Sequence, residues 1–214
     1  MSDIWAVVPV KDFELAKQRL AVAFSPALRR ALAQAMLEDV LAALRAVKQL
    51  GGVLVVTADP EAALLAAKFG ARVLNEQQPR GLNAAITLAA RNLAVEKRAG
   101  MLVLPGDIPG VKPAEITELL SAHGTAPAVS LIAAHDGKGT NALLVTPPCG
   151  LDFHYGEGSF AKHCAAARHI SIEPTICHAP GIAFDVDTPA DIAVLECLPH
   201  RSNTRALLED QGLL

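Results

Sequence analysis

The chain has 214 residues, a length typical of one domain; 51% of them are hydrophobic and only 19% are charged. This composition excludes a disordered chain, which combines low hydrophobicity with high charge. The net charge of −3 offers no broad basic field for nucleic acid or an anionic membrane, and the 4% of aromatic residues are too few for a platform that stacks single-stranded nucleic acid.

The first part of the chain alternates short apolar runs with helical patterns. We predict strands at residues 4–10, 53–57, 71–75 and 101–104. We predict helices from Ser25-Pro26 to a stop at Gly51-Gly52, from Asp59-Pro60 to Gly70, over 82–97, and from Pro113 to about Gly124. This order of strands and helices indicates an α/β protein with a mostly parallel sheet and helices on both faces.

After residue 126 the pattern changes. Strands at 128–134 and 141–145 flank the turn-rich residues 136–139, so we expect a hairpin appended to the parallel sheet. A helix from Ser159 to about 169, a strand near 181–185 and a helix opened by the capping sequence Thr188-Pro189-Ala190-Asp191 follow. We interpret residues 1–214 as one domain, in which 126–160 carry the inserted hairpin and 201–214 form a C-terminal tail with a short helix.

The sequence indicates neither a membrane nor an oxidising compartment. It holds no run of about 18 or more apolar residues, and its first ten residues carry Asp3 and no basic region of a signal peptide. The four cysteines, at positions 149, 164, 177 and 197, include no Cys-x-x-Cys pair. We therefore expect a cytoplasmic protein with free thiols rather than a zinc site or disulfides.

Three cationic residues, Lys11, Lys17 and Arg19, follow the first predicted strand. Ligands of doubly wound sheets bind at the carboxyl ends of the strands, and Lys and Arg pair with phosphate oxygens. The cluster predicts an anionic ligand such as a triphosphate, although a solvated helix face accounts for the same residues. The chain has neither a Walker A loop nor a Gly-x-Gly-x-x-Gly turn after this strand.

Further polar residues follow the third and fourth strands. Gly81 permits close backbone approach, and Asn83 can either cap a helix or read a base edge. Asp107, in a turn rich in Pro and Gly, suits a hard divalent cation or, alternatively, an Asx-turn. Asp185 and Asp187 lie two residues apart at a predicted strand end, where they could complete a Mg²⁺ site with Asp107. Alternatively, Asp187 supports the turn into the next helix.

A third group of candidates combines small hydroxyls with glycines. Thr140 follows the turn of the hairpin, and Ser159 follows Gly156 and Gly158 at a predicted helix start. Hydroxyls and exposed backbone N–H groups there can bind a phosphate or carboxylate. The alternative is a hairpin turn followed by a helix N-cap. His163 lies one turn after Ser159 and faces the same direction, although a histidine in such a place is more often structural.

Taken in chain order, these motifs resemble one family. They are Pro-Val-Lys with Lys17, Arg19 and Leu20, then Gly81-Leu82-Asn83, Gly106-Asp107-Ile108-Pro109, Asp136-Gly137-x-Gly139-Thr140-Asn141, Gly156-x-Gly158-Ser159-Phe160 and Asp185-Val186-Asp187-Thr188-Pro189. The resemblance, over about residues 4–195, is to the guanylyltransferases of deazaflavin-coenzyme biosynthesis, which act on 2-phospho-L-lactate, phosphoenolpyruvate or 3-phospho-D-glycerate. It implies the nucleotide-diphospho-sugar transferase fold, a three-layer α/β/α sandwich with a mixed, mostly parallel sheet.

The resemblance also implies roles for the candidates. Substrate-binding residues for the phosphorylated acid would be Thr140, Gly156 and Ser159; metal ligands for Mg²⁺ would be Asp107, Asp185 and Asp187; nucleotide-binding residues would be Lys11, Arg19, Gly81 and Asn83; and catalytic residues would be Lys11, Lys17, Arg19 and Asp107.

The implied reaction transfers GMP from GTP to the phosphate of the acid, releases pyrophosphate and hands the product to a downstream transferase. Two alternatives remain: another nucleotidyltransferase of the same fold, with a molybdopterin or sugar phosphate acceptor, and a non-catalytic GTP-binding module. An Ala-rich helix surface could pack against a second copy of the chain in a homodimer.

Overall fold

The computed structural model describes residues 3–76, 80–197 and 202–214. In these ranges seven strands form one sheet in the order β3-β2-β1-β4-β6-β5-β7. The strands are β1 (Ile4–Pro9), β2 (Leu50–Thr57), β3 (Arg72–Asn75), β4 (Gly100–Val103), β5 (Ala128–Ala133), β6 (Thr140–Thr146) and β7 (Thr175–Ile176). Strand β6 runs antiparallel to its neighbours β4 and β5, and the other pairs are parallel. The mixed, mostly parallel sheet and the β5–β6 hairpin confirm the predictions.

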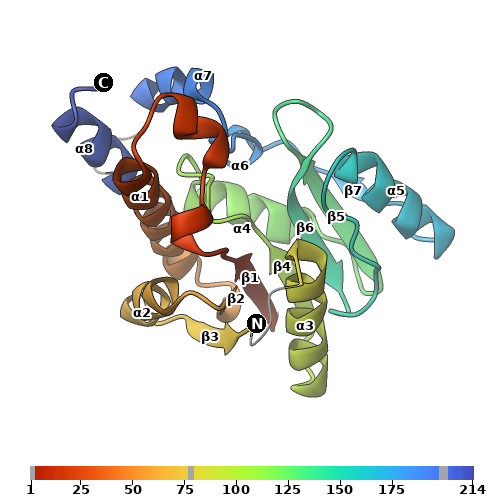
Figure 1. Ribbon diagram of the computed structural model, residues 1–214. Coiled ribbons are helices and arrows are strands. Elements are labelled where there is room, and N and C mark those ends of the chain that lie inside the picture. The colour runs from red at the N-terminus through yellow and green to blue at the C-terminus, as the bar shows by residue number, and fades with distance from the viewer. Residues whose placement is uncertain (1–2, 77–79, 198–201) are drawn as a thin grey trace.

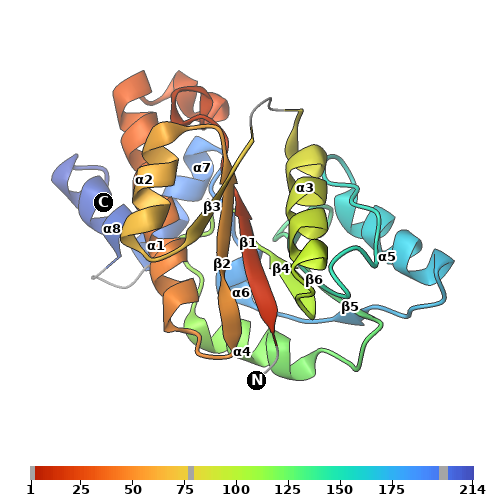
Figure 2. The ribbon, with the colours of Figure 1, turned by 90° about the horizontal axis from the view of Figure 1, so that it is seen from below.

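Helices cover both faces of the sheet and give three layers (Figure 1, Figure 2). Helices α1, α2 and α4 contribute to the core on one face, and α3 and α5 to the core on the other. The long helices are α1 (Pro26–Ala46), α2 (Pro60–Lys68), α3 (Leu82–Val95), α4 (Pro113–Ala122) and α5 (Ser159–His169). This arrangement confirms the predicted α/β/α sandwich. None of the helices in the described ranges is long and apolar enough to cross a membrane.

The central strands β1, β4, β5 and β6 are buried on both faces, which explains why they appear in the sequence as continuous apolar runs. Side chains of a strand point alternately to the two faces of a sheet. In β1, Ile4, Ala6 and Val8 pack on the side of α1. Trp5 and Val7 of the same strand pack on the side of α3. The two cores therefore share one strand. Because both of its faces are apolar, its sequence does not alternate between polar and apolar residues.

Shorter helices surround the carboxyl edge of the sheet. They are η1 (Phe13–Leu15), η2 (Gln18–Val22), α6 (Pro180–Ala183), α7 (Pro189–Ile192), η3 (Ala193–Cys197) and α8 (Asn203–Asp210). The predicted N-terminus of α1 is confirmed, since the Ser25 hydroxyl accepts a hydrogen bond of 3.2 Å from the Leu28 N–H. The predicted capping box of α7 is confirmed as well, between Thr188 and Asp191. Helix α8 is the short helix predicted in the tail, whose first residue, Arg201, lies outside the described ranges.

The prediction that Gly51-Gly52 ends the first long helix is wrong. Helix α1 ends at Ala46, and both glycines lie inside β2. The reason is the neighbouring indole of Trp5: a Cβ at Gly52 would lie 2.6 Å from a ring carbon of Trp5. Glycine in a strand often marks such a close approach, so these two glycines make room for a side chain instead of stopping a helix.

The predicted strand near 181–185 is also wrong, because α6 occupies the start of this segment. Pro180 is at the first turn of α6, where its fixed φ favours a helix. The edge of the sheet is taken by β7, which was not predicted and pairs with β5. As a result, Asp185 and Asp187 lie in the loop between α6 and α7 rather than at a strand end.

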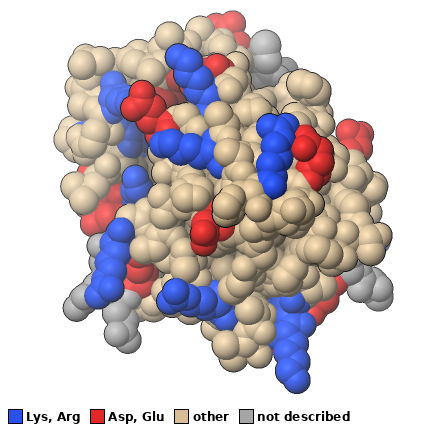
Figure 3. Space-filling model, turned by 90° about the vertical axis from the view of Figure 1, so that its right-hand side faces the viewer, with Lys and Arg blue, Asp and Glu red and all other residues tan. Residues whose placement is uncertain are grey.

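Charged side chains are dispersed on the face that carries α5. Figure 3 shows Lys and Arg interspersed with Asp and Glu there, on a surface that is mostly uncharged. The thiols of Cys149, Cys164 and Cys177 are free, and Cys164 is buried. The side chain of Cys197 lies outside the described part of the chain.

A third core joins the tail to the loops of the carboxyl edge, and we call it the C-terminal cluster. Its buried members are Leu20, Leu32, Met36, Val186, Ile192, Leu195 and Leu208. Helix α8 is tied to α1 by Asp39, whose carboxylate accepts hydrogen bonds from the Ser202 hydroxyl (3.0 Å) and from the N–H of Asn203 (2.8 Å). Because Leu20 and Val186 belong to the loops around Lys17 and Asp187, the tail supports both loops.

Replacing Leu208 by Ala tests this support. Leu208 is fully buried, so Leu208→Ala should lower the free energy of unfolding by about 2–4 kcal/mol through lost burial and a residual cavity. Leu213 is 38% exposed and lies in the same tail, so Leu213→Ala serves as the control, with an expected loss below about 1 kcal/mol. Urea denaturation measures both. Equal losses in the two variants would show that α8 is not docked as described.

Candidate active site at the carboxyl edge of the sheet

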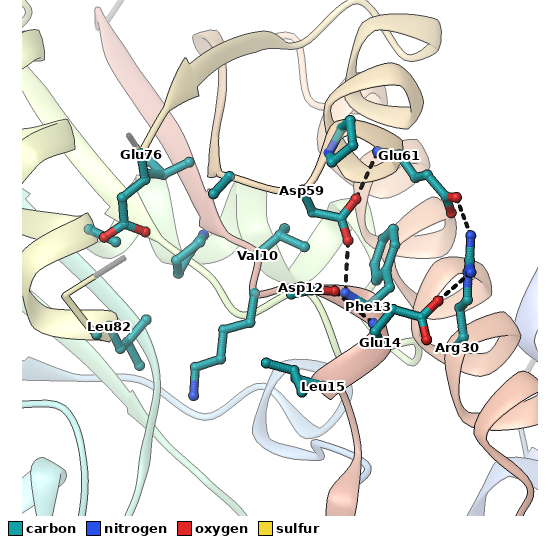
Figure 4. A pocket seen from close by; sticks show the side chains of 17 residues that line it. Val10, Asp12, Phe13, Glu14, Leu15, Arg30, Asp59, Glu61, Glu76 and Leu82 are labelled. Atoms are coloured by element: carbon teal, nitrogen blue, oxygen red, sulfur yellow. Dashed lines mark hydrogen bonds and ion pairs between the residues drawn. The ribbon is translucent and has the colours of Figure 1, made fainter. Parts of the chain in front are cut away.

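A cavity of about 530 Å³ opens beyond the carboxyl ends of β1 and β2 (Figure 4). Its lining includes Lys11 after β1, Asp59 after β2, and Gly81 and Leu82 at the start of α3. The position agrees with the rule that ligands of open α/β sheets bind outside the carboxyl ends of the strands. Of the predicted nucleotide-binding residues, Lys11 and Gly81 therefore line one cavity.

Asp59 anchors the loop that carries Lys11, a role that the sequence analysis missed because Asp59-Pro60 was interpreted only as a helix start. Its carboxylate accepts hydrogen bonds from the N–H of Phe13 (2.8 Å) and from the N–H of Glu61 (2.7 Å), as Figure 4 shows. Arg30 of α1 adds ion pairs to Glu61 and to Glu14 of the same loop. The loop after β1 is thus fixed against both α1 and α2.

Lys17, Asp107 and Asp187 meet beside this loop. The Lys17 ammonium forms ion pairs with Asp107 and, at 3.1 Å, with Asp187. Arg19 reaches the other oxygen of Asp187 at 3.3 Å. Burial of Lys17 acts to lower its pKa, but the two carboxylates outweigh burial and raise the pKa above its ordinary value. Lys17 is therefore charged, and the structure brings together two predicted cations and two predicted carboxylates.

The backbone at Lys17 is strained. Its φ of 52° and ψ of 42° place it in the left-handed region, which costs a non-glycine residue about 1–3 kcal/mol. Such strain persists only where the surroundings impose it, and here the two ion pairs of the ammonium hold the residue. The backbone of the opposite loop is tied in too, since the Val186 N–H donates to the Asp107 carbonyl at 3.1 Å.

Asp185 is held by Asn141, a β6 residue that the sequence analysis placed in a motif without a role. The Asn141 amide donates to the Asp185 carboxylate at 3.0 Å and to the Ala183 carbonyl at 3.0 Å. Burial raises the pKa of Asp185; the Asn141 hydrogen bond opposes this rise, and repulsion from the other two carboxylates adds to it. The three predicted metal ligands are close enough to repel one another.

The donor types of this cluster fit a hard cation such as Mg²⁺, which prefers carboxylate oxygens. A cation can contact two of the carboxylates at once, because the Lys17 ammonium already bridges Asp107 and Asp187. In the residues that the structure describes, no three His, Cys, Asp or Glu side chains form a group that could hold a metal ion. Asp107 and Asp187 are thus spaced for a shared cation, with Asp185 beside them on Asn141.

The partners of these aspartates are cations rather than the turn bonds of the alternative interpretations, and metal binding stays a prediction. Asp107 pairs with Lys17 through its side chain, and no cap or Asx-turn bond to it is formed by the described residues. The turn into α7 is supported by Asp191, which accepts hydrogen bonds from the N–H groups of Asp187 (2.9 Å) and Thr188 (2.7 Å). The Asp187 carboxylate is left for Lys17 and Arg19.

Thr140, Gly156, Ser159 and His163 lie around the hairpin turn, and we call them the acceptor cradle after the acceptor-binding role that the sequence predicts for the first three. Thr140 begins β6 and is 6% exposed, and Ser159 begins α5 and is 2% exposed. The Phe160 N–H donates to the Lys138 carbonyl at 3.0 Å, which fixes the start of α5 against the turn. The N-cap of α5 is Gly158, so Ser159 is not the cap. No described residue makes a hydrogen bond to the Ser159 hydroxyl.

His163 connects the cradle to the loop before α5. Its Nδ1 lies 3.0 Å from the Thr140 hydroxyl, and its Nε2 accepts a hydrogen bond of 2.9 Å from the His154 N–H. Burial, reinforced by the nearby charge of His154, lowers the pKa of His163 to about 4. The imidazole is therefore neutral at pH 7.

Asn83 neither caps α3 nor lines the cavity. The N-cap is Gly81, and the Asn83 amide exchanges two hydrogen bonds with the Tyr155 backbone, donating at 3.1 Å and accepting at 2.7 Å. The side chain thus joins the start of α3, which lines the cavity, to the loop of the acceptor cradle. Its contact with a nucleotide stays a prediction.

Comparisons with known proteins support one family. A family model described as "Guanylyl transferase CofC like" matches residues 4–209. A phosphoenolpyruvate guanylyltransferase of Rubrobacter xylanophilus is 40% identical over 193 residues, 90% of this chain and 93% of the relative. Another, of Conexibacter woesei, is 39% identical over 95% of this chain and 94% of the relative. A 3-phospho-D-glycerate guanylyltransferase of Colwellia psychrerythraea is 36% identical over 90% of each chain.

Solved structures show the same fold at low identity. A putative nucleotide-diphospho-sugar transferase of Desulfovibrio desulfuricans matches with a TM-score of 0.78 and 17% identity, covering 99% of this chain and 96% of the other. A cytidylyltransferase of Leptospira borgpetersenii matches with a TM-score of 0.60 and 11% identity, covering 99% of this chain and 94% of the other. Both confirm the predicted nucleotide-diphospho-sugar transferase type of fold.

The buried His163 predicts a loss of stability in acid. Its pKa is about 4 in the folded chain and about 6.5 when unfolded, so below about pH 6.5 the unfolded state binds a proton that the folded state does not. Stability should fall by on the order of 2 kcal/mol from pH 7.5 to pH 5 through this residue. Urea denaturation at both pH values measures the loss, which His163→Asn should reduce. The variant keeps the contribution of His123, whose pKa burial also lowers. An unchanged pH dependence in His163→Asn contradicts the assignment.

Proposed function

The chain belongs to the family of CofC-like guanylyl transferases, and from this premise we propose that it transfers GMP from GTP to a small phosphorylated three-carbon acid. The observation that carries the proposal is the meeting of three regions at one edge of the sheet: the cavity, the Lys17 cluster of cations and carboxylates, and the acceptor cradle. Relatives named for phosphoenolpyruvate favour that acid as the acceptor, ahead of 2-phospho-L-lactate and 3-phospho-D-glycerate. The product would serve deazaflavin-coenzyme biosynthesis through a downstream transferase.

The cavity suits the guanosine end of the donor. Its volume of about 530 Å³ lies within the range of about 300–1,000 Å³ that is usual for small-molecule sites. Gly81 lines it with a φ of 93°, and nothing lies within 4 Å of the position that a Cβ would take. A nucleoside can therefore approach the backbone at the start of α3. Lys11 in the same lining brings positive charge toward the triphosphate.

The acceptor cradle suits the phosphorylated acid. The Ser159 hydroxyl is nearly buried yet free to donate, and the Thr140 hydroxyl lies in the same cradle. Gly156, with a φ of 122°, belongs to the loop that precedes α5. Hydroxyls and backbone N–H groups at such a turn bind phosphate or carboxylate oxygens. A small acid with both groups would fill these donors without any aromatic stacking.

The reaction needs positioning and charge compensation more than proton transfer. A phosphate oxygen of the acid attacks the α-phosphorus of GTP, a new phosphoanhydride bond forms, and the bond to the β-phosphate breaks so that pyrophosphate leaves with its electron pair. The attacking phosphate is already ionised at pH 7, so no general base is needed. Lys11, Lys17 and Arg19 would offset the charge that develops on pyrophosphate. Asp107 and Asp187, with Asp185 beside them, would hold Mg²⁺, which would supply Lewis-acid stabilisation of the phosphate oxygens.

Pyrophosphate release tests the proposed function. GTP with Mg²⁺ and phosphoenolpyruvate should yield pyrophosphate, and ATP or CTP in place of GTP should yield much less. 2-Phospho-L-lactate and 3-phospho-D-glycerate are assayed in parallel to rank the acceptors. Pyrophosphate with a molybdopterin or sugar phosphate acceptor alone would identify another nucleotidyltransferase of this fold. A rise in melting temperature with GTP, but no pyrophosphate with any acceptor, would favour a GTP-binding module.

Asp107 tests the metal assignment. Asp107→Ala should lower kcat by at least about a hundredfold, because it removes a carboxylate of the proposed Mg²⁺ site and a partner of Lys17. The fold should survive, since Asp107 is partly exposed and lies at the edge of the sheet. Asp152→Ala, at an exposed position, is the matched control and should leave kcat unchanged. Near-normal turnover of Asp107→Ala at low Mg²⁺ would contradict the assignment.

A further inference from the structure

The acceptor cradle contains two consecutive hydrogen bonds, from His154 to His163 and from His163 to Thr140, and a backbone N–H sets their direction. The first bond begins at the His154 N–H, which lies 2.9 Å from His163 Nε2. A backbone N–H can only donate, so Nε2 is the acceptor and carries no proton. The neutral imidazole has a single N–H, which must then be on Nδ1. Nδ1 lies 3.0 Å from the Thr140 hydroxyl oxygen and donates to it.

This direction decides what the Thr140 hydroxyl can offer to a ligand. A hydroxyl has one proton to donate and two lone pairs to accept with. One lone pair of Thr140 is taken by His163, and no described residue accepts the Thr140 proton. In the opposite tautomer, Thr140 would spend its proton on Nδ1 and present only lone pairs, which repel an anion.

We propose that His163 is a positioning residue that keeps the Thr140 hydroxyl as a hydrogen-bond donor to the anionic acceptor substrate. The inference rests on the proposed function, in which Thr140 binds a phosphorylated acid. His163 does not itself contact the substrate, because its side chain is fully buried behind Thr140. Its effect is to leave the Thr140 proton available to an anion, whose oxygens accept hydrogen bonds.

The fold holds the His154 N–H, the donor of the first hydrogen bond, in place. The residue after His154 is Tyr155, whose backbone N–H and carbonyl are both bonded to the Asn83 amide of α3. The Tyr155 ring packs edge-on against the His163 imidazole, with ring centroids 4.8 Å apart. The loop that supplies the His154 N–H is thus fixed to a long helix, and the tautomer of His163 follows from the tertiary structure.

Two variants of His163 separate its two hydrogen bonds. In His163→Asn the amide nitrogen reaches the position of Nδ1 and can still donate to Thr140. In His163→Gln the longer amide reaches the position of Nε2 and loses the donor at Nδ1. We expect His163→Gln to raise KM for phosphoenolpyruvate at least about tenfold, as the loss of a hydrogen bond to a charged group does. KM for GTP should stay within about twofold, and His163→Asn should keep KM for phosphoenolpyruvate within about threefold of wild type.

His123 supplies the matched control. It bridges Ser130 (2.8 Å) and Thr146 (3.0 Å) at the opposite end of the same hairpin, so it is a histidine with two similar bonds away from the cradle. His123→Gln should change the melting temperature without changing KM for phosphoenolpyruvate. Equal effects of His163→Gln and His163→Asn on that KM, or no effect of His163→Gln, would overturn the inference.

A measurement on the wild-type chain keeps the inference testable even where a variant fails to fold. Nuclear magnetic resonance of the chain labelled with ¹⁵N-histidine at pH 7 should show the Nδ1–H tautomer for His163. The Nε2–H tautomer or a charged imidazolium would overturn the inference. If wild type releases no pyrophosphate with any acid, the proposed function fails. In that case two measurements still test the role of His163: its tautomer by nuclear magnetic resonance, and the affinity for phosphoenolpyruvate of wild type and of His163→Gln by calorimetry.

Discussion

The buried ammonium of Lys17 is the interaction on which the carboxyl edge depends. It joins the loop after β1 to Asp107 after β4 and to Asp187 before α7, residues that are far apart in the chain. A charge with a side chain only 7% exposed is stable there because two carboxylates compensate it. The same carboxylates repel each other and Asp185. The ammonium therefore needs the carboxylates to be stable in its buried position, and the carboxylates need the ammonium to offset their repulsion.

The apolar support behind this cluster explains how the loops stay in register. Leu20 follows the cations and Val186 lies between two aspartates, and both side chains point into the C-terminal cluster with Leu208 of α8. Burial of aliphatic side chains stabilises the loops but does not fix their orientation, because the hydrophobic effect is non-directional. The hydrogen bond from the Val186 N–H to the Asp107 carbonyl fixes how the two loops lie against each other. The acceptor cradle is supported differently, by the Asn83 amide and the His163 imidazole. One part of the site is therefore held by packing and the other by hydrogen bonds.

Much of the fold followed from local patterns. Continuous apolar runs predicted four parallel strands, and the capping residues Ser25 and Thr188 predicted the helices that they begin. The errors share one cause, which is that contacts between residues remote in sequence overrode the local pattern. Gly51 and Gly52 were interpreted from local propensity, whereas the indole of Trp5 decides their place in β2. The segment 181–185 was interpreted as a strand, but β7 already occupies the edge of the sheet.

The motifs in chain order were enough to name the residues of the candidate site and the family, because residue types and spacing are properties of the chain itself. The pairing of those residues was decided only by the tertiary structure. The fold placed Lys17 against Asp107, an ion pair that the sequence did not predict, and the His154 N–H set the tautomer of His163 and with it the direction of the bond to Thr140. A hydrogen bond or ion pair depends on distances of about 3 Å between atoms, and such distances between residues remote in sequence exist only after folding.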